Sequence, residues 1–218
     1  MADKNKAKFF DPKNVDLKNN DLRLHAPHVD RNKDVILNVL KDYFPEKATV
    51  LEFASGTGQH ASYFASQLPN IHWIPSDIED DKLASILAWK NHCGMPNLAD
   101  PLYLNLMKEW PLLPKVDAVC AFNLIHIAPW TLTRHLFKAA SSLLESGGQL
   151  YLYGPYKRGG EHTSQSNVQF DRNLKSSNPE WGVRAMEDVI EAANRTRFAD
   201  PTILPMPANN FSLIFEKL

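Results

Sequence analysis

Hydrophobic and polar positions follow two alternating periods along this chain. Short apolar runs, typical of buried strands, are separated by stretches with apolar side chains at every third or fourth position, which predict amphipathic helices. The expected strands lie near residues 50–53, 71–77, 101–106, 116–122 and 149–153, with helices near 31–43, 61–68, 83–87 and 132–143. Because a parallel strand pair needs a crossover of about a dozen residues, usually a helix, the alternation predicts a parallel sheet with helices on both faces.

The C-terminal part of the chain departs from this alternation. A helix near 186–193 leads to a strand at 202–206, and a brief turn at 207–210 connects it directly to a strand at 211–215. Two strands joined so tightly must be antiparallel. The expected fold class is therefore α/β, with a mostly parallel sheet that ends in an antiparallel hairpin.

Composition limits the class of protein further. The chain has 218 residues, of which 44% are hydrophobic and 22% charged, with a formal charge of −1, so it lacks the basic field expected of a nucleic-acid binder. Residues 1–21 alternate Lys, Asp and Asn and are expected to form a flexible tail, whereas 22–218 are expected to form a single domain. No apolar run is long enough for a membrane span, and the first residues lack a signal core.

Cysteine usage points to a reducing compartment. Cys93 and Cys120 are too few and too isolated for a disulfide framework, and no Cys/His cluster has metal-site spacing. We therefore expect no metal, and a location in the cytosol or, by size alone, also in the nucleus. The oligomeric state stays open.

The most informative segment is residues 50–60, VLEFASGTGQH, in which an apolar strand runs into a glycine turn and the start of a helix. Such a turn points backbone N–H groups and the positive end of a helix dipole at a nucleotide-like ligand. Gly56 and Gly58 are expected to let the main chain approach that ligand where a Cβ would clash. Glu52 is costly to bury without a cationic or donating partner, and the amino group of a ligand is the expected one.

The spacing of this turn leaves alternatives open. Gly56-x-Gly58-x-x-Ala61 also fits the dinucleotide fingerprint, with Asp77 where a ribose-binding acid is expected. Glu52 separates the two classes, because dinucleotide enzymes usually have an apolar residue there. The segment instead resembles the acid-x-Gly-x-Gly-x-Gly pattern of S-adenosylmethionine enzymes, with Ala54 in place of the first glycine. A third interpretation is a tight turn that binds no ligand.

Further side chains are expected at the same carboxyl edge of the sheet. Asp77 would bind the ribose, or alternatively cap the next helix. Asn105 and Leu106 end the third strand and suit the amino group and the ring face of an adenine, although related enzymes often have Asp at the position of Asn105. Arg31, expected just before the first helix, would fork onto a cofactor carboxylate or pair with a neighbouring aspartate. The expected cofactor-binding set is Arg31, Glu52, Ala54, Ser55, Gly56, Gly58, Asp77, Ile78, Asn105, Leu106 and Asn123.

Longer motifs carry a narrower resemblance. The segments ASGTGQH, NLIHIAPW, LYGPYKRGG, QSNVQFD, NPEWGVRAMED and MPANNFSLIF together resemble the methyltransferase-like protein 26 family, from about Pro27 to the last residue. The resemblance implies a Rossmann-like class I methyltransferase fold with a seven-stranded sheet and S-adenosyl-L-methionine as cofactor. No established substrate comes with it, so the expected function is a methyltransferase acting on a small molecule. The alternatives are a cofactor-binding protein without catalysis that acts through partners, and a nicotinamide-dependent dehydrogenase.

Residues after the fourth and fifth strands are the candidates for contact with the methyl acceptor. His126 has the near-neutral pKa of a general base, although a core or capping histidine is the plainer interpretation. Tyr153 and Tyr156 lie around a glycine and offer acids or aromatic walls, and an aromatic wall would attract a sulfonium. Residues 157–182 are polar and rich in Gly, Ser and Asn, which predicts a long lid or binding loop. His162 is interpreted as a solvated residue of that loop.

Overall fold

The computed structural model describes residues 21–109 and 113–218, which fold into two compact units. One unit ends at Cys120, and the other runs from Ala121 to Leu218. The expectation of one domain over residues 22–218 stays a prediction. The expected tail lies outside the described residues apart from Asp21.

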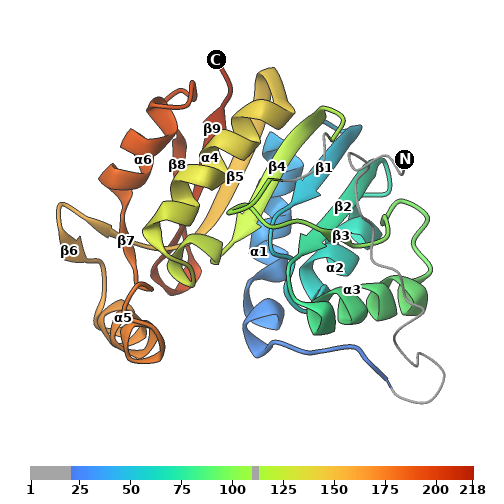
Figure 1. The fold of residues 1–218 in the computed structure, drawn as a ribbon, viewed down its shortest axis with the longest axis horizontal. Coiled ribbons are helices and arrows are strands. Elements are labelled where there is room, and N and C mark those ends of the chain that lie inside the picture. The colour runs from blue at the N-terminus through green and yellow to red at the C-terminus, as the bar shows by residue number, and fades with distance from the viewer. Residues whose placement is uncertain (1–20, 110–112) are drawn as a thin grey trace. The chain divides into compact units, whose positions relative to one another are not determined.

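The first unit is a layer of helices on parallel strands (Figure 1). Its elements are α1 (Pro27–Tyr43), β1 (Ala48–Glu52), α2 (Gln59–Gln67), β2 (Ile71–Asp77), α3 (Asp80–Cys93), β3 (Leu102–Tyr103) and β4 (Val116–Phe122), whose last two residues belong to the second unit. The strand order is β3-β2-β1-β4, and each neighbouring pair is parallel. Helix α2 packs on β2 between α1 and α3. The carboxyl ends of β1 and β2 therefore meet at one edge, with Glu52 in register with Pro75.

The second unit is built around one long strand. Its elements are η2 (Leu124–His126), α4 (Trp130–Leu143), β5 (Leu144–Arg158), β6 (Glu161–His162), α5 (Gln165–Ser177), β7 (Arg184–Ala185), α6 (Met186–Asn194), β8 (Thr202–Met206), η3 (Pro207–Asn209) and β9 (Asn210–Glu216). Strand β9 lies between β5 and β8 and is antiparallel to both. Helices α4 and α6 contact each other and pack on β5. Phe137, Phe198 and Phe215 form an edge-to-face cluster in its core.

These elements confirm the expected fold class, a mostly parallel sheet that ends in an antiparallel hairpin. The bounds of β2, β4 and β8 are those expected from the sequence. The seven strands on the main path of the described sheet are joined by two short ones, β6 and β7, which pair with β5 and were not expected. The third strand is shorter than expected, because only Leu102 and Tyr103 pair with β2.

Two expectations about the second unit are wrong. The pair Gly147-Gly148 in the sequence predicts the end of the preceding helix, but β5 already begins at Leu144. Gly147 donates its N–H to the carbonyl of Lys217, and Gly148 accepts the N–H of Lys217. Residues 157–182 are not one long loop, since they contain β6 and the 13-residue helix α5. The buried face of α5 carries Asn167, Asp171 and Leu174, so two of its three buried side chains are polar.

No helix within residues 21–109 and 113–218 is long and apolar enough to cross a membrane.

Candidate functional site

The turn after β1 combines two glycines that serve different purposes. Both have left-handed backbone angles, with φ of +56° at Gly56 and +83° at Gly58, as has Ala54 with φ of 53°. A Cβ at Gly56 would meet nothing within 4 Å, whereas one at Gly58 would lie 2.8 Å from Cα of Ile86 on α3. Gly58 is therefore required for packing of the chain on itself, and Gly56 alone matches the expectation of an open approach for a ligand.

Glu52 ends β1 as a buried carboxyl group that is 1% exposed. Its Oε2 accepts a hydrogen bond of 2.8 Å from the indole Nε1 of Trp73 on β2, so a ligand is not needed to supply the first donor. Burial raises the pKa of Glu52 to about 7, against the donors Trp73 and Ser55, which lower it, while Asp77 raises it further. Both donors are neutral. Within the described chain, no Lys or Arg is among the groups that shift this pKa, so the carboxylate lacks a balancing charge.

Asp77 ends β2 and ties the glycine turn to the adjacent strand. Its two oxygens accept hydrogen bonds from the backbone N–H groups of Gly56 (2.9 Å), Ile78 (2.7 Å) and Glu79 (3.2 Å). The alternative role as helix cap is wrong, because the N-cap of α3 is Glu79, which makes no side-chain cap bond. Burial raises the pKa of Asp77, and its backbone donors oppose that shift. Two carboxyl groups with raised pKa values thus lie at one sheet edge.

The expected adenine contacts also lie in the first unit. Ile78 follows Asp77 directly and is 50% exposed, which is unusual for a large apolar side chain beside a buried carboxyl group. Leu106 is buried, and Asn105 is half-buried. The Oδ1 atom of Asn105 accepts the backbone N–H of Met107 at 2.9 Å. Its amide N–H₂ has no partner among the described residues, so it remains the available group for a ring nitrogen.

Arg31 lies within α1 rather than before it, because Pro27 occupies the first helical position, where its missing N–H costs nothing. The arginine is exposed. The expected pairing with a neighbouring aspartate is not observed, since Asp30 pairs with Lys33 at 2.8 Å and Asp34 accepts the hydroxyl of Tyr63. Its role toward a cofactor carboxylate stays a prediction.

His126 and Tyr156 form a second cluster, which lies wholly in the second unit. Both side chains are fully buried, and their rings meet edge to face with centroids 5.2 Å apart. Both ring nitrogens of His126 and the hydroxyl of Tyr156 lack a hydrogen-bond partner among the described residues. Burial lowers the pKa of His126 to about 3 and raises that of Tyr156, so both groups are neutral near pH 7. A buried polar group without a partner typically costs about 1–3 kcal/mol, which marks this cluster for attention.

Neighbouring residues fix the position of that cluster. Tyr153 and Tyr156 lie within β5 rather than after it, and Tyr153 is 4% exposed. Asn123 has a left-handed φ of 59° and precedes η2, while its backbone N–H bonds to the carbonyl of Tyr153 at 2.8 Å. The turn-forming role of Asn123 is thus observed, and its contact with a cofactor stays a prediction. Gly154 makes room for the imidazole of His126.

Replacement of Gly154 by Ala should destabilise the second unit. The new Cβ would lie 2.4 Å from Nε2 of His126, an overlap that typically costs about 1–3 kcal/mol. Chemical denaturation should show this loss in the wild-type background and a smaller one in a His126→Ala background. Equal losses in both backgrounds would contradict the direct contact.

The segment from β6 to β7 is held together by buried polar contacts that sequence reasoning missed. Asp171 on α5 accepts the backbone N–H of Val183 (2.7 Å) and the Nζ of Lys175 (2.6 Å), and Nε2 of His162 lies 3.4 Å away. His162 is therefore not a solvated loop residue. Arg184 donates to the carbonyls of Ile125, Ala128 and Glu180. No spacing in the sequence signals these contacts, because they depend on the fold of α5.

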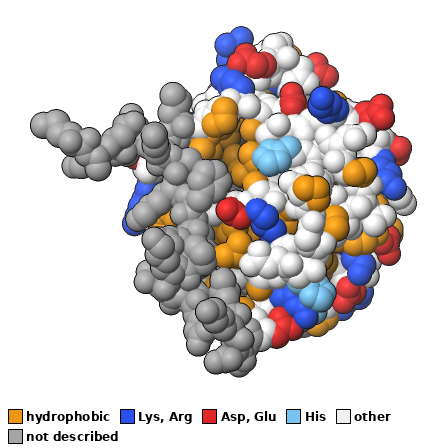
Figure 2. Space-filling view, turned by 90° about the vertical axis from the view of Figure 1, so that its right-hand side faces the viewer, with side chains coloured by type: hydrophobic (Ala, Val, Ile, Leu, Met, Phe, Trp, Pro, Cys, Tyr) orange, Lys and Arg blue, Asp and Glu red, His pale blue; other side chains and the backbone are white. Residues whose placement is uncertain are grey.

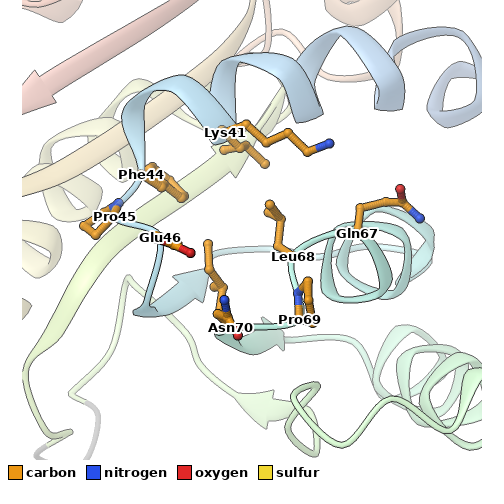
Figure 3. Close-up of a pocket in the computed structure, with 10 residues that line it drawn as sticks. Lys41, Phe44, Pro45, Glu46, Gln67, Leu68, Pro69 and Asn70 are labelled. Carbon is orange, nitrogen blue, oxygen red and sulfur yellow. The ribbon is translucent and has the colours of Figure 1, made fainter.

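A shallow groove lies away from these residues, between the ends of α1 and α2 (Figure 3). Phe44 and Leu68 form apolar walls, and the groove is bordered by the chain that enters β1 and β2 at their amino ends. Ligands of open α/β sheets bind at the carboxyl ends of the strands. The groove is therefore not the candidate cofactor site. Within the described residues, no group of three His, Cys, Asp or Glu side chains is placed to hold a metal ion.

Solved structures define the class of fold. The chain is similar to SibL, an S-adenosylmethionine-dependent methyltransferase (14% identity, TM-score 0.73, covering 87% of this chain and 55% of that one). It is similar to human N-acetylserotonin methyltransferase in complex with SAM (16% identity, TM-score 0.72, 87% and 52%). A third is an O-methyltransferase family 2 protein from Planctomyces limnophilus in complex with apigenin (15% identity, TM-score 0.71, 85% and 62%). The fold is thus that of class I methyltransferases, and the chain spans between half and two thirds of these proteins' lengths.

A family model matches residues 23–217, and its description is "Protein of unknown function (DUF938)". The chain belongs to this family. The narrower resemblance to methyltransferase-like protein 26 stays a hypothesis.

Proposed function

We propose that this chain is an S-adenosylmethionine-dependent methyltransferase whose acceptor is a small molecule. The observation that carries the proposal is the pair of buried carboxyl groups, Glu52 and Asp77, at the carboxyl ends of adjacent parallel strands on either side of a glycine turn. Buried carboxyl groups with raised pKa values are costly to keep, and such groups cluster at functional sites. This edge is also where ligands of open α/β sheets bind.

The residues present fit the cofactor. Glu52 lacks a cationic partner and suits an ammonium group, while Asp77 suits ribose hydroxyls beside the open turn at Gly56. Ile78 and Leu106 supply apolar contact for an adenine, and the free amide of Asn105 supplies a donor. When bound, S-adenosylmethionine supplies an activated methyl group. The protein then has to orient the acceptor and exclude water.

The residues proposed to bind the methyl acceptor are His126, Tyr153 and Tyr156. Because His126 is neutral near pH 7, it can accept or donate a hydrogen bond at either nitrogen, and Tyr156 can do the same at its hydroxyl. These groups suit hydrogen bonds to an uncharged polar acceptor, which reaches them only if the residues that bury them move, because both side chains are fully buried. The proposal of a small molecule is supported by the surface, since Lys, Arg, Asp and Glu are interspersed on the face drawn in Figure 2. The neighbouring structure with apigenin is consistent with it.

A second candidate function is a cofactor-binding protein without catalysis. The pKa of about 3 favours it, because His126 would be a weak base at neutral pH. Incubation with S-adenosylmethionine and a panel of small hydroxyl, amine and thiol acceptors separates the two. Release of S-adenosylhomocysteine supports the enzyme. Tight binding without release across the panel supports the second candidate.

Calorimetry with S-adenosylhomocysteine tests the cofactor site. We expect micromolar binding by the wild type and a loss of about tenfold or more in Asp77→Asn, because hydrogen bonds to charged groups contribute about 1.5–3 kcal/mol. The Asn side chain keeps one oxygen for the backbone donors. Asp117→Asn is the matched control, since this carboxylate also accepts a backbone N–H, that of Thr49, at 2.7 Å. Absence of heat with the wild type would refute the proposed function.

A further inference from the structure

Trp73 donates the indole hydrogen bond that orients the carboxyl group of Glu52. It is fully buried on β2, and its backbone makes two hydrogen bonds of 2.8 Å to the segment after α3. One runs from its N–H to the carbonyl of Asn97 and the other from the N–H of Ala99 to its carbonyl. Its ring packs against Phe64 of α2 with centroids 5.4 Å apart. Backbone and ring are thus both anchored, so the indole N–H points at the carboxyl group without freedom to turn away.

The hydrogen bond between these residues does not neutralise the carboxylate. An indole N–H is a neutral donor, and it occupies only one of about four acceptor positions of a carboxylate. The titratable groups that face Glu52 are Asp77 at the end of β2 and the thiol of Cys120 on β4. Neither is a cation. A cationic partner for Glu52 therefore has to come from outside this cluster.

We propose that Trp73 is a positioning residue of the cofactor site, which holds the Glu52 carboxylate in place and thereby selects ligands that carry a cationic α-amino group. The inference rests on the proposed function and deepens it, because it assigns the recognition of the amino-acid part of the cofactor to a residue outside the glycine turn. Without the indole N–H, the ionised form of Glu52 is less favoured relative to the protonated form. The carboxylate is also less well oriented. The nucleoside part of the cofactor is recognised by other residues and is not affected.

The test compares two ligands that differ in the amino-acid part. S-adenosylhomocysteine carries the α-amino group, whereas 5′-methylthioadenosine has the same nucleoside and thioether without it. Trp73→Phe keeps an aromatic ring near Phe64 and removes the indole N–H together with the second ring of the indole. Trp89→Phe is the matched control, since its indole N–H donates to the backbone carbonyl of Leu24 and not to a carboxyl group. Circular dichroism establishes that both variants are folded.

We expect Trp73→Phe to bind S-adenosylhomocysteine about tenfold more weakly, the effect of losing one hydrogen bond to a charged group. Its binding should also require a higher pH than that of the wild type, because the ionised form of Glu52 has lost a donor. Affinity for 5′-methylthioadenosine should stay unchanged, as should both affinities in Trp89→Phe. An unchanged affinity and pH profile, or equal weakening for both ligands, would overturn the inference. No binding of either ligand by the wild type would instead refute the proposed function.

A measurement on the wild type keeps the inference testable if Trp73→Phe fails to fold. In ¹⁵N spectra, the assigned indole N–H signal of Trp73 should shift with the titration of Glu52 near pH 7. Addition of S-adenosylhomocysteine should move this signal, and 5′-methylthioadenosine should leave it in place. Identical responses to the two ligands would overturn the inference.

Discussion

Glu52→Gln is expected to stabilise the free protein at pH 8 while it weakens cofactor binding. The pKa of Glu52 is raised from 4.5 to about 7, so the folded protein favours the protonated form. The contribution of Glu52 to stability is therefore greatest below pH 4.5, falls as pH rises to about 7, and is constant above. The total loss is about 3 kcal/mol, because a pKa difference of one between the folded and unfolded states corresponds to about 1.4 kcal/mol. Gln is uncharged at every pH and keeps an oxygen for Trp73, so it avoids this loss.

Thermal unfolding provides the measurement. The melting temperature of Glu52→Gln should exceed that of the wild type by about 5–10 °C at pH 8, and the difference should shrink toward pH 5. Binding of S-adenosylhomocysteine should fall by about 30-fold or more, as for removal of one partner of a buried, hydrogen-bonded charge pair. Glu46→Gln, at an exposed glutamate of the first unit, is the control and should change neither quantity. A lower melting temperature at pH 8 would mean that the carboxylate stabilises the free protein, contrary to its lack of a cationic partner.

Gly58→Ala should cost far more stability than Gly56→Ala, although the two glycines lie in the same turn. At Gly58 the added Cβ meets the backbone of Ile86 at 2.8 Å, and φ of +83° adds strain. The sum is about 4 kcal/mol, from overpacking of about 1–3 kcal/mol and left-handed strain of about 1–2 kcal/mol. At Gly56 only the strain applies, so the loss should be about 1–2 kcal/mol.

Urea unfolding and binding of S-adenosylhomocysteine, measured on both variants, distinguish a glycine needed for packing from one needed for ligand contact. Gly56→Ala should remain folded and bind S-adenosylhomocysteine more weakly, because its Cβ projects into open space beside the Asp77 carboxylate. Gly58→Ala should be strongly destabilised or largely unfolded in the absence of ligand. Similar stabilities for both variants would show that α3 can move away from the turn, and that Gly58 is not fixed by packing.

The sequence predicted those elements whose burial is apolar throughout. Strand β4, from Val116 to Phe122, is a continuous apolar run apart from one exposed Asp, so its period and bounds were both readable. Helix α5 escaped prediction because its buried positions include Asn167 and Asp171, and hydrophobic periodicity carries no signal when the inner face is polar. Ser164, which caps α5 through its hydroxyl, was the one local signal available.

For the candidate site, too, the sequence indicated some residues and could not indicate the contacts between them. Glu52 and Asp77 could be proposed from the sequence because a carboxyl group at the end of an apolar strand is unusual. The bond from Trp73 to Glu52 could not be found, because it depends on the register of β1 and β2, which sequence does not state. The same holds for Gly58, whose neighbour Ile86 is brought into contact only by the packing of α3.

The place of β9 in the second unit has a consequence for how this protein is made. Strand β5 receives its long antiparallel partner from residues far along the chain, with Gln149 paired to Glu216. Such distant pairing requires closure of a large loop and slows folding. On a ribosome, the first unit can acquire its parallel strand pairs before β9 is synthesised, whereas the second cannot pair β5 with β9 until Glu216 has left the exit tunnel.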